Sequence, residues 1–188
     1  MEMEREMERE METTMRKKII CAIMIFALAA LSACGARKDT DNGKEQGLAG
    51  FTEPEEDSTG KLLLDDFGER MGKDPDQTAL KLAEGIISNE AIPFMGMAME
   101  AESGFLSGFT EEITGFREAA VFGPQISTIP FVGYIFVLEE GSDVASFAEN
   151  LKEKSDPAWN ICTEADQTVI DYYGNTVFFL MCPESLEG

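Results

Sequence analysis

The sequence of 188 residues contains no histidine. This absence excludes nucleophilic catalysis by serine–histidine or cysteine–histidine pairs, and it excludes histidine ligands to zinc, copper or haem iron. It also removes the side chain that most often acts as a general base near neutral pH. An enzyme mechanism would have to use carboxylates, lysine, tyrosine or a bound cofactor, so the composition favours a protein that is not an enzyme.

Basic residues are scarce. The chain has 15 lysines and arginines against 36 aspartates and glutamates, which gives a formal net charge of −21. The phosphates of nucleic acids and anionic lipid headgroups repel such a chain. We therefore predict no nucleic-acid partner and no electrostatic docking onto membranes.

The apolar run near the N-terminus is too short for a comfortable membrane span. It covers Ile19–Leu31, about a dozen residues, whereas a spanning helix needs about 20. Basic residues precede it at positions 16–18, and small residues follow it. This arrangement is typical of a secretory signal peptide that is cleaved.

The residues at the expected cleavage point are Leu31, Ser32, Ala33 and Cys34, and they resemble a bacterial lipobox. The resemblance implies that residues 15–33 are a lipoprotein signal peptide and that the Cys34 thiol carries a diacylglyceryl group. The protein would then be lipid-anchored on the outer, extracytoplasmic face of the cell membrane. Two acyl chains hold firmly where one is marginal, because each buried CH₂ contributes about 0.8 kcal/mol. The alternative is an ordinary secretory signal with a chance cysteine.

The first 14 residues repeat methionine and glutamate and place six glutamates upstream of the basic patch. Signal peptides do not normally carry acidic residues there. We predict that residues 1–14 are a non-native N-terminal extension and that translation begins at Met15. A regulatory helix is the alternative.

The remainder divides into a tether and a domain. Residues 34–73 are rich in Gly, Asp, Glu, Lys and Thr and are predicted to form a flexible tether. Residues 74–188 are predicted to form a single domain. The exception within the tether is KLLLDDFGERMG, whose apolar side chains could dock onto the domain: Leu62, Leu63, Leu64 and Phe67.

The domain is predicted to begin with a helix, with Asp74 as its N-cap, Pro75 as its first residue and its end before Pro93. Strands are predicted over residues 94–100 and 118–122. The apolar residues of the helix recur at helical spacing: Ala79, Leu80, Ala83, Ile86 and Ile87.

The clearest strand covers residues 131–138, which are nearly all apolar and are therefore expected at the centre of a sheet. A second helix is expected to begin at residues 141–143 and to end near Pro157. Residues 169–173 and 176–181 are β-rich and flank Gly174-Asn175, which predicts a hairpin.

The predicted order is helix, three strands, helix and two strands. It indicates an α+β fold: a two-layer domain with an antiparallel or mixed sheet of about five strands and two helices on one face. The phrases PFVGYIF, WNICTEA and VFFLMCP, within residues 95–183, resemble small uncharacterised lipoproteins of Gram-positive gut bacteria. Since those families have no established activity, the resemblance implies none in particular.

Cys162 and Cys182 are the cysteines left after the signal peptide and Cys34. The predicted hairpin pairs Cys182 near Gln167, about five residues from Cys162. A disulfide would require the intervening residues to fold back and bring the Cα atoms within about 4.4–6.8 Å. The alternative is a pair of buried free thiols, which pack as small hydrophobic groups.

Residues 104–116 are rich in glycine but carry several large apolar side chains. Two interpretations are open: these side chains pack under the sheet, or they are exposed as a patch that binds a partner. The residues of the candidate patch are Phe105, Leu106, Phe109 and Phe116, with Ile113 among them.

Trp159 is expected to close one end of the core; a platform for a ligand is the alternative. Met95, Met97 and Met99 have the spacing of one strand face, which on a covered sheet is core; a copper(I) site is the alternative. We predict no catalytic residue, no metal site and no cofactor.

The sequence thus predicts a membrane-tethered extracytoplasmic lipoprotein whose domain is a non-enzymatic protein-interaction module with a partner in the cell envelope. The anchor, the long spacer and the lack of catalytic groups motivate this interpretation. The alternative is a small-ligand receptor that works with a transporter or a sensor.

Overall fold

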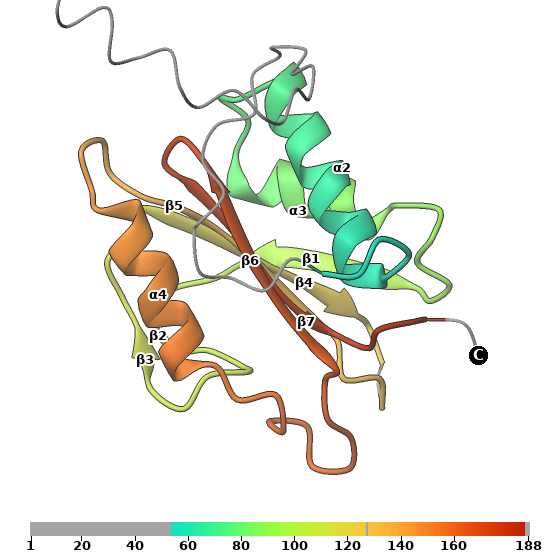
Figure 1. Ribbon diagram of the computed structural model, residues 1–188. Coiled ribbons are helices and arrows are strands. Elements are labelled where there is room, and N and C mark those ends of the chain that lie inside the picture. Colours follow the sequence, from blue (N-terminus) through green and yellow to red (C-terminus); the bar gives the residue numbers. More distant parts are fainter. Residues whose placement is uncertain (1–53, 127, 187–188) are drawn as a thin grey trace, which may run out of the picture. The chain divides into compact units, whose positions relative to one another are not determined.

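The computed structural model describes residues 54–126 and 128–186 (Figure 1). The predictions for residues 1–14, the signal peptide, Cys34 and the tether as far as residue 53 lie outside the described residues. The described part contains three helices, a five-stranded sheet and a small two-stranded sheet. The predicted α+β class is confirmed.

The large sheet has the strand order β1-β4-β5-β7-β6, and each neighbouring pair is antiparallel. The short strands β2 (Gly104–Phe105) and β3 (Glu112–Ile113) form a separate antiparallel pair. The strands of the large sheet are β1 (Gly96–Glu100), β4 (Glu118–Pro124), β5 (Val132–Val137), β6 (Gln167–Tyr173) and β7 (Thr176–Cys182).

Strands β5 and β7 lie in the interior of the sheet, and all of their residues are buried. The prediction of a buried strand over residues 131–138 is confirmed. The hairpin of β6 and β7 also forms as predicted. Gly174 has a φ of 59° in its turn, and the Asn175 amide donates to the Leu138 carbonyl over 2.7 Å.

Side chains of β7 alternate between two hydrophobic clusters. Phe178 and Leu180 join the cluster that contains α2 and α3, whereas Val177 and Phe179 join the cluster that contains α4. We call these two sides of the sheet the α2–α3 face and the α4 face (Figure 1). The helices are α2 (Thr59–Lys73), α3 (Ala79–Ile87) and α4 (Val144–Lys154).

Helix α2 lies within the segment predicted to be tether. Leu63, Phe67 and Met71 recur every four residues and are buried. The Phe67 ring stacks on Phe178 of β7 with ring centroids 5.3 Å apart. Residues 59–73 are therefore a helix of the domain and not tether, and the expected docking of this segment is confirmed for Leu63 and Phe67.

The boundary between α2 and α3 also differs from the prediction. Asp74 follows the last turn of α2, and its N–H donates to the Arg70 carbonyl over 2.9 Å. The N-cap of α3 is Thr78, whose hydroxyl accepts a hydrogen bond from the Lys81 N–H. The residues between Asp74 and Thr78 turn the chain from one helix to the next. Asp74 therefore ends α2, and α3 begins after Thr78.

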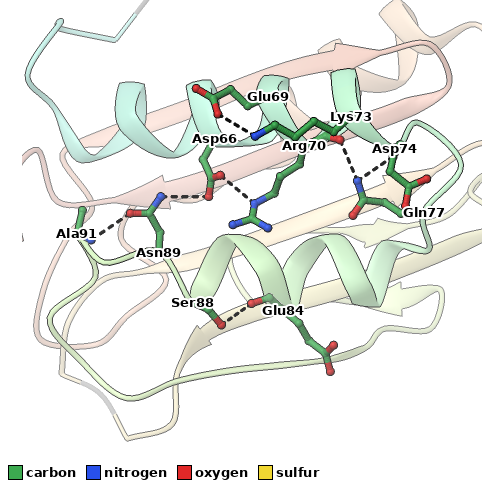
Figure 2. A network of polar contacts seen from close by, with 10 residues as sticks. All are labelled: Asp66, Glu69, Arg70, Lys73, Asp74, Gln77, Glu84, Ser88, Asn89 and Ala91. Carbon is green, nitrogen blue, oxygen red and sulfur yellow. Dashed lines mark hydrogen bonds and ion pairs between the residues drawn. The ribbon is translucent and has the colours of Figure 1, made fainter.

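Polar contacts join α2 to the residues that precede and follow α3 (Figure 2). The Asp66 carboxylate accepts hydrogen bonds from Arg70 Nε over 2.8 Å and from Asn89 Nδ2 over 3.1 Å. The Gln77 amide donates to the carbonyls of Arg70 and Asp74 over 3.2 and 2.8 Å. These contacts hold the two helices side by side over the sheet.

Helix α4 begins after Asp143, as predicted. Hydrogen bonds from the Ser146 N–H and hydroxyl lower the pKa of the Asp143 carboxyl. Phe147 and Leu151 are buried on the α4 face. The layer of two helices on one face is confirmed, but its members are α2 and α3. Helix α4, which was expected beside α3, covers the opposite face.

Gly133 of β5 lies opposite Phe122 of β4, and a Cβ atom at this position would overlap the buried Phe122 ring. We expect Gly133→Ala to lower the free energy of unfolding by about 1–3 kcal/mol, the usual cost of overpacking a core. The measurement is urea unfolding followed by Trp159 fluorescence.

The matched control is Gly68→Ala in α2, where an added methyl group meets no atom within 4 Å. It should stabilise the protein by roughly 0.5–1 kcal/mol, because alanine favours a helix over glycine. Equal effects of the two substitutions would contradict the packing of Phe122 against Gly133.

Candidate functional site

The two faces of the sheet are covered unequally. On the α2–α3 face, α3 contacts β1, β4 and β5, and α2 contacts β6 and β7, so helices cover all five strands. On the α4 face, the single helix α4 contacts β6 and β7. The half of this face over β5, β4 and β1 needs other cover.

The segment of residues 101–116 supplies part of that cover. The Phe109 ring packs against Phe179 and Tyr134, with ring centroids 4.6 and 5.7 Å apart. The Phe116 ring packs against Phe136 at 5.2 Å. The Tyr134 hydroxyl donates to the Ser107 carbonyl over 3.0 Å, and burial raises its pKa, so it remains a donor.

This packing decides between the two interpretations of residues 104–116. Leu106, Phe109 and Phe116 are half-buried against the cluster on the α4 face, and Ile113 is buried. Phe105 is 76% exposed. The prediction of a four-residue interaction patch is therefore wrong. Three of the four residues complete the core, and Phe105 is the one that is exposed.

A cavity of about 330 Å³ lies on the α4 face beyond this segment. Strand β1 contributes Met97 and Met99, and the neighbouring strands contribute Val121 and Val132. Its volume is at the lower end of the range of small-ligand sites. The polar side chains in its lining are those of Ser107 and Asn160, next to Trp159.

Two of the three methionines differ from the sequence expectation, whereas the tryptophan agrees with it. Met95, just before β1, and Met99, within it, are 75% and 48% exposed, because β1 is an edge strand whose α4 face is left partly uncovered. Trp159 packs against the cluster on the α4 face as expected, but it also lines the cavity. Flexible thioethers beside an indole ring form a surface that adapts to apolar groups.

The outer edge of β1 is the second feature of the site. The Met95 carbonyl accepts a hydrogen bond from the Gln125 N–H, and the Ala101 N–H donates to the Ala119 carbonyl. Both pairs continue the register of β1 and β4, in which Met97 lies opposite Gly123. Because bonded pairs alternate in an antiparallel ladder, Met97 and Met99 bond to β4. The backbone groups of Gly96, Ala98 and Glu100 then point away from the sheet, where no described strand pairs with them.

The opposite edge of the sheet, β6, is different. Across the two-residue turn, the backbone N–H and C=O of Tyr173 bond to Thr176 of β7. Because bonded residues alternate along the strand, the N–H and C=O of Tyr172 point away from the sheet. The Tyr172 N–H donates to the carboxylate of Asp171 over 2.8 Å. One outward donor of this edge is thus already used, and a charged side chain lies along it.

A second hollow of about 560 Å³ lies at the start of α2. Its lining includes Asp57, Ser58, Ser185 and Leu186, which are at the two ends of the described residues. The cavity between β1 and Trp159 is lined by residues within 97–160, which lie far from both ends of the described residues. We therefore take this cavity, together with the outer edge of β1, as the candidate site.

Cys162 and Cys182 do not form a disulfide. Both thiols are free; Cys182 is buried in β7, whereas Cys162 is exposed in the loop before β6. The expectation of two buried thiols is therefore wrong for Cys162. Burial, and next the charge of Asp166, raise the pKa of the Cys182 thiol to about 12.

Among residues 54–126 and 128–186, no group of three or more Cys, Asp or Glu side chains is arranged to hold a metal ion. In the same described ranges, no helix has the length and apolar character that crossing a membrane requires.

No protein-family model matches the chain, and no match is found among curated proteins or solved structures. The function is therefore argued from the site and from the N-terminal sequence.

The two thiols should differ strongly in reactivity, because the thiolate is the reactive form. In the native chain at about pH 8, we expect iodoacetamide to modify Cys162 and to leave Cys182 unmodified until the protein is unfolded in urea. Peptide mass spectrometry after timed alkylation measures both sites. Equal rates at Cys162 and Cys182 in the native chain would contradict the burial of β7.

Proposed function

We propose that the protein is a lipoprotein tethered to the outer face of the cell membrane through Cys34, and that its α+β domain is a non-enzymatic module that binds another protein of the cell envelope. The lipobox-like residues Leu31 to Cys34 support the anchor. The resemblance to small lipoproteins of Gram-positive gut bacteria agrees with it. The observation that carries the binding role is the cavity beside the outer edge of β1, to which no strand among the described residues is paired.

The chemistry of the cavity supports binding over catalysis. General acid–base catalysis needs a titratable group within hydrogen-bond reach of the reacting atoms. The lining of this cavity is made of apolar, aromatic, methionine and glycine residues with Ser107 and Asn160, and none of its side chains titrates near neutral pH. Tryptophan and methionine are enriched in the cores of protein interfaces.

A small-ligand receptor that works with a transporter or sensor is the second candidate. The volume of about 330 Å³ favours it, since small ligands occupy sites of similar size. Such sites usually fix their ligand with several convergent polar groups. This cavity offers two polar side chains, those of Ser107 and Asn160. A protein partner is therefore the better-supported proposal.

The anchor has a direct test. We expect the full-length protein, produced in a bacterial host fed with an alkyne-bearing fatty acid, to become labelled and to fractionate with the membrane. Cys34→Ser should lose both the label and the membrane association, because its hydroxyl does not replace the acylated thiol. Equal labelling of the wild type and Cys34→Ser would contradict the proposed anchor.

The binding role is tested by photocrosslinking in intact cells. We expect benzoylphenylalanine at position 99 to yield a recurrent protein adduct. The matched control is position 173, whose natural side chain Tyr173 has a similar exposure, 39% against 48% for Met99, and lies at the opposite edge of the sheet. A small molecule that co-purifies with the domain, without a protein adduct at position 99, would favour the receptor instead.

A further inference from the structure

We propose that the outer edge of β1 is a docking strand: an extended, positively charged segment of the partner adds to the sheet beside β1 and places an apolar side chain in the cavity between Met97, Met99 and Trp159. This inference rests on the proposed function and names the surface and the kind of segment that it binds. Addition of a strand to an open sheet edge is a common mode of peptide recognition.

The contrast between the two edges of the sheet is the first argument. Folded proteins protect exposed edges with proline, lysine, bulges or charged side chains, because an open edge pairs with other chains. Strand β6 has Asp171, which accepts the outward N–H of Tyr172. Strand β1 has the sequence GMAME, with neither proline nor lysine. Its one charged residue is Glu100, at the end of the strand, and no described side chain bonds to the outward groups of β1.

The outward groups of β1 are numerous enough to hold a strand. Gly96, Ala98 and Glu100 each present an N–H and a C=O on the outer side, as the register requires. These groups fit an extended segment of about five residues. The strand is well supported from behind, because α3 packs so closely that a Cβ atom at Gly96 would overlap the Ile87 side chain.

The cavity gives the added strand a place for a side chain. Side chains of a strand alternate between the faces of its sheet, so every second residue of the added strand would lie on the α4 face beside Met97 and Met99. Directly opposite residues in paired strands have Cβ atoms about 4.5–5.5 Å apart. Since Met97 and Met99 also line the cavity, an apolar side chain at this position reaches it.

The charge around β1 sets the chemistry of the partner. Residues 82–116, which include β1, contain six glutamates and neither lysine nor arginine, although Glu111 is paired with Lys154 from α4. Glu100 and Glu102 are exposed at the end of the strand. A segment with lysine or arginine next to its apolar residues therefore complements the edge. A second copy of this chain is disfavoured, because it would bring the same acidic edge against itself.

The test uses full-length chain in detergent and a library of random dodecapeptides displayed on phage. We expect the selected peptides to alternate apolar residues with others and to carry lysine or arginine. Glu100→Pro should weaken binding of a synthetic selected peptide by about tenfold or more, because proline removes an outward donor and blocks the edge. The β1–β4 bonds are kept, since the Glu100 N–H does not point to β4.

The matched control is Glu100→Gln, which removes the same charge but keeps the N–H. It should weaken binding by about threefold or less, as expected for one exposed charge. Thermal unfolding of both variants verifies that the domain is intact. Equal affinities of Glu100→Pro and Glu100→Gln, or selected peptides without alternation, would overturn the proposal. A dimer of the chain that Glu100→Pro dissociates would replace it with self-association.

Failure of this inference is distinguishable from failure of the proposed function. A protein adduct from position 99 that persists in Glu100→Pro would leave the binding module in place and remove the docking strand. Absence of any protein adduct from position 99 would remove the binding module itself.

Discussion

The structure depends on the burial of β5 and β7 on both sides. Every residue in these two strands is buried, and successive side chains point to opposite faces. Each buried apolar side chain stabilises the fold by roughly 1.5–3 kcal/mol only if other groups exclude water from it. The domain therefore needs cover on both faces, and the placement of α2, α3, α4 and residues 101–116 follows from this requirement.

The candidate site results from the limited width of that cover. Neighbouring strands are about 4.8 Å apart, and a helix with its side chains is about 10 Å across, so one helix covers two or three strands. Two helices cover the five strands on the α2–α3 face, whereas α4 covers β6 and β7. Phe109 and Phe116 extend the cover over β5. The cavity remains over β4 and β1, and the same strand β1 has the open edge.

Sequence patterns predicted the elements whose signal is local. The run at residues 131–138 and the hairpin around Gly174-Asn175 form as predicted, because burial on both sides and turn chemistry are encoded within a few residues. Helix α2 falls within the predicted tether because that prediction rests on the polar composition of residues 34–73 as a whole, within which the apolar residues of this segment are an exception. The four-residue spacing of Leu63, Phe67 and Met71 is the signal that identifies it.

Features that depend on strand order could not be predicted in the same way. Periodicity shows that a helix has an apolar side, but it does not show which face of the sheet the helix covers, so α4 was placed beside α3. Met97 and Met99 were expected in the core, since a strand pattern does not reveal an edge. The lack of proline and lysine in GMAME is a signal for an open edge once the order β1-β4-β5-β7-β6 is known.

Amide hydrogen exchange, resolved by residue with NMR, tests the central claim about β1 most directly. In the free protein the amides of Ala98 and Glu100 should exchange rapidly, while those of Met97 and Met99 are protected by β4. When the partner segment binds, Ala98 and Glu100 should become protected and Tyr172 should not change. Rapid exchange at Ala98 and Glu100 in the bound state would contradict strand addition at this edge.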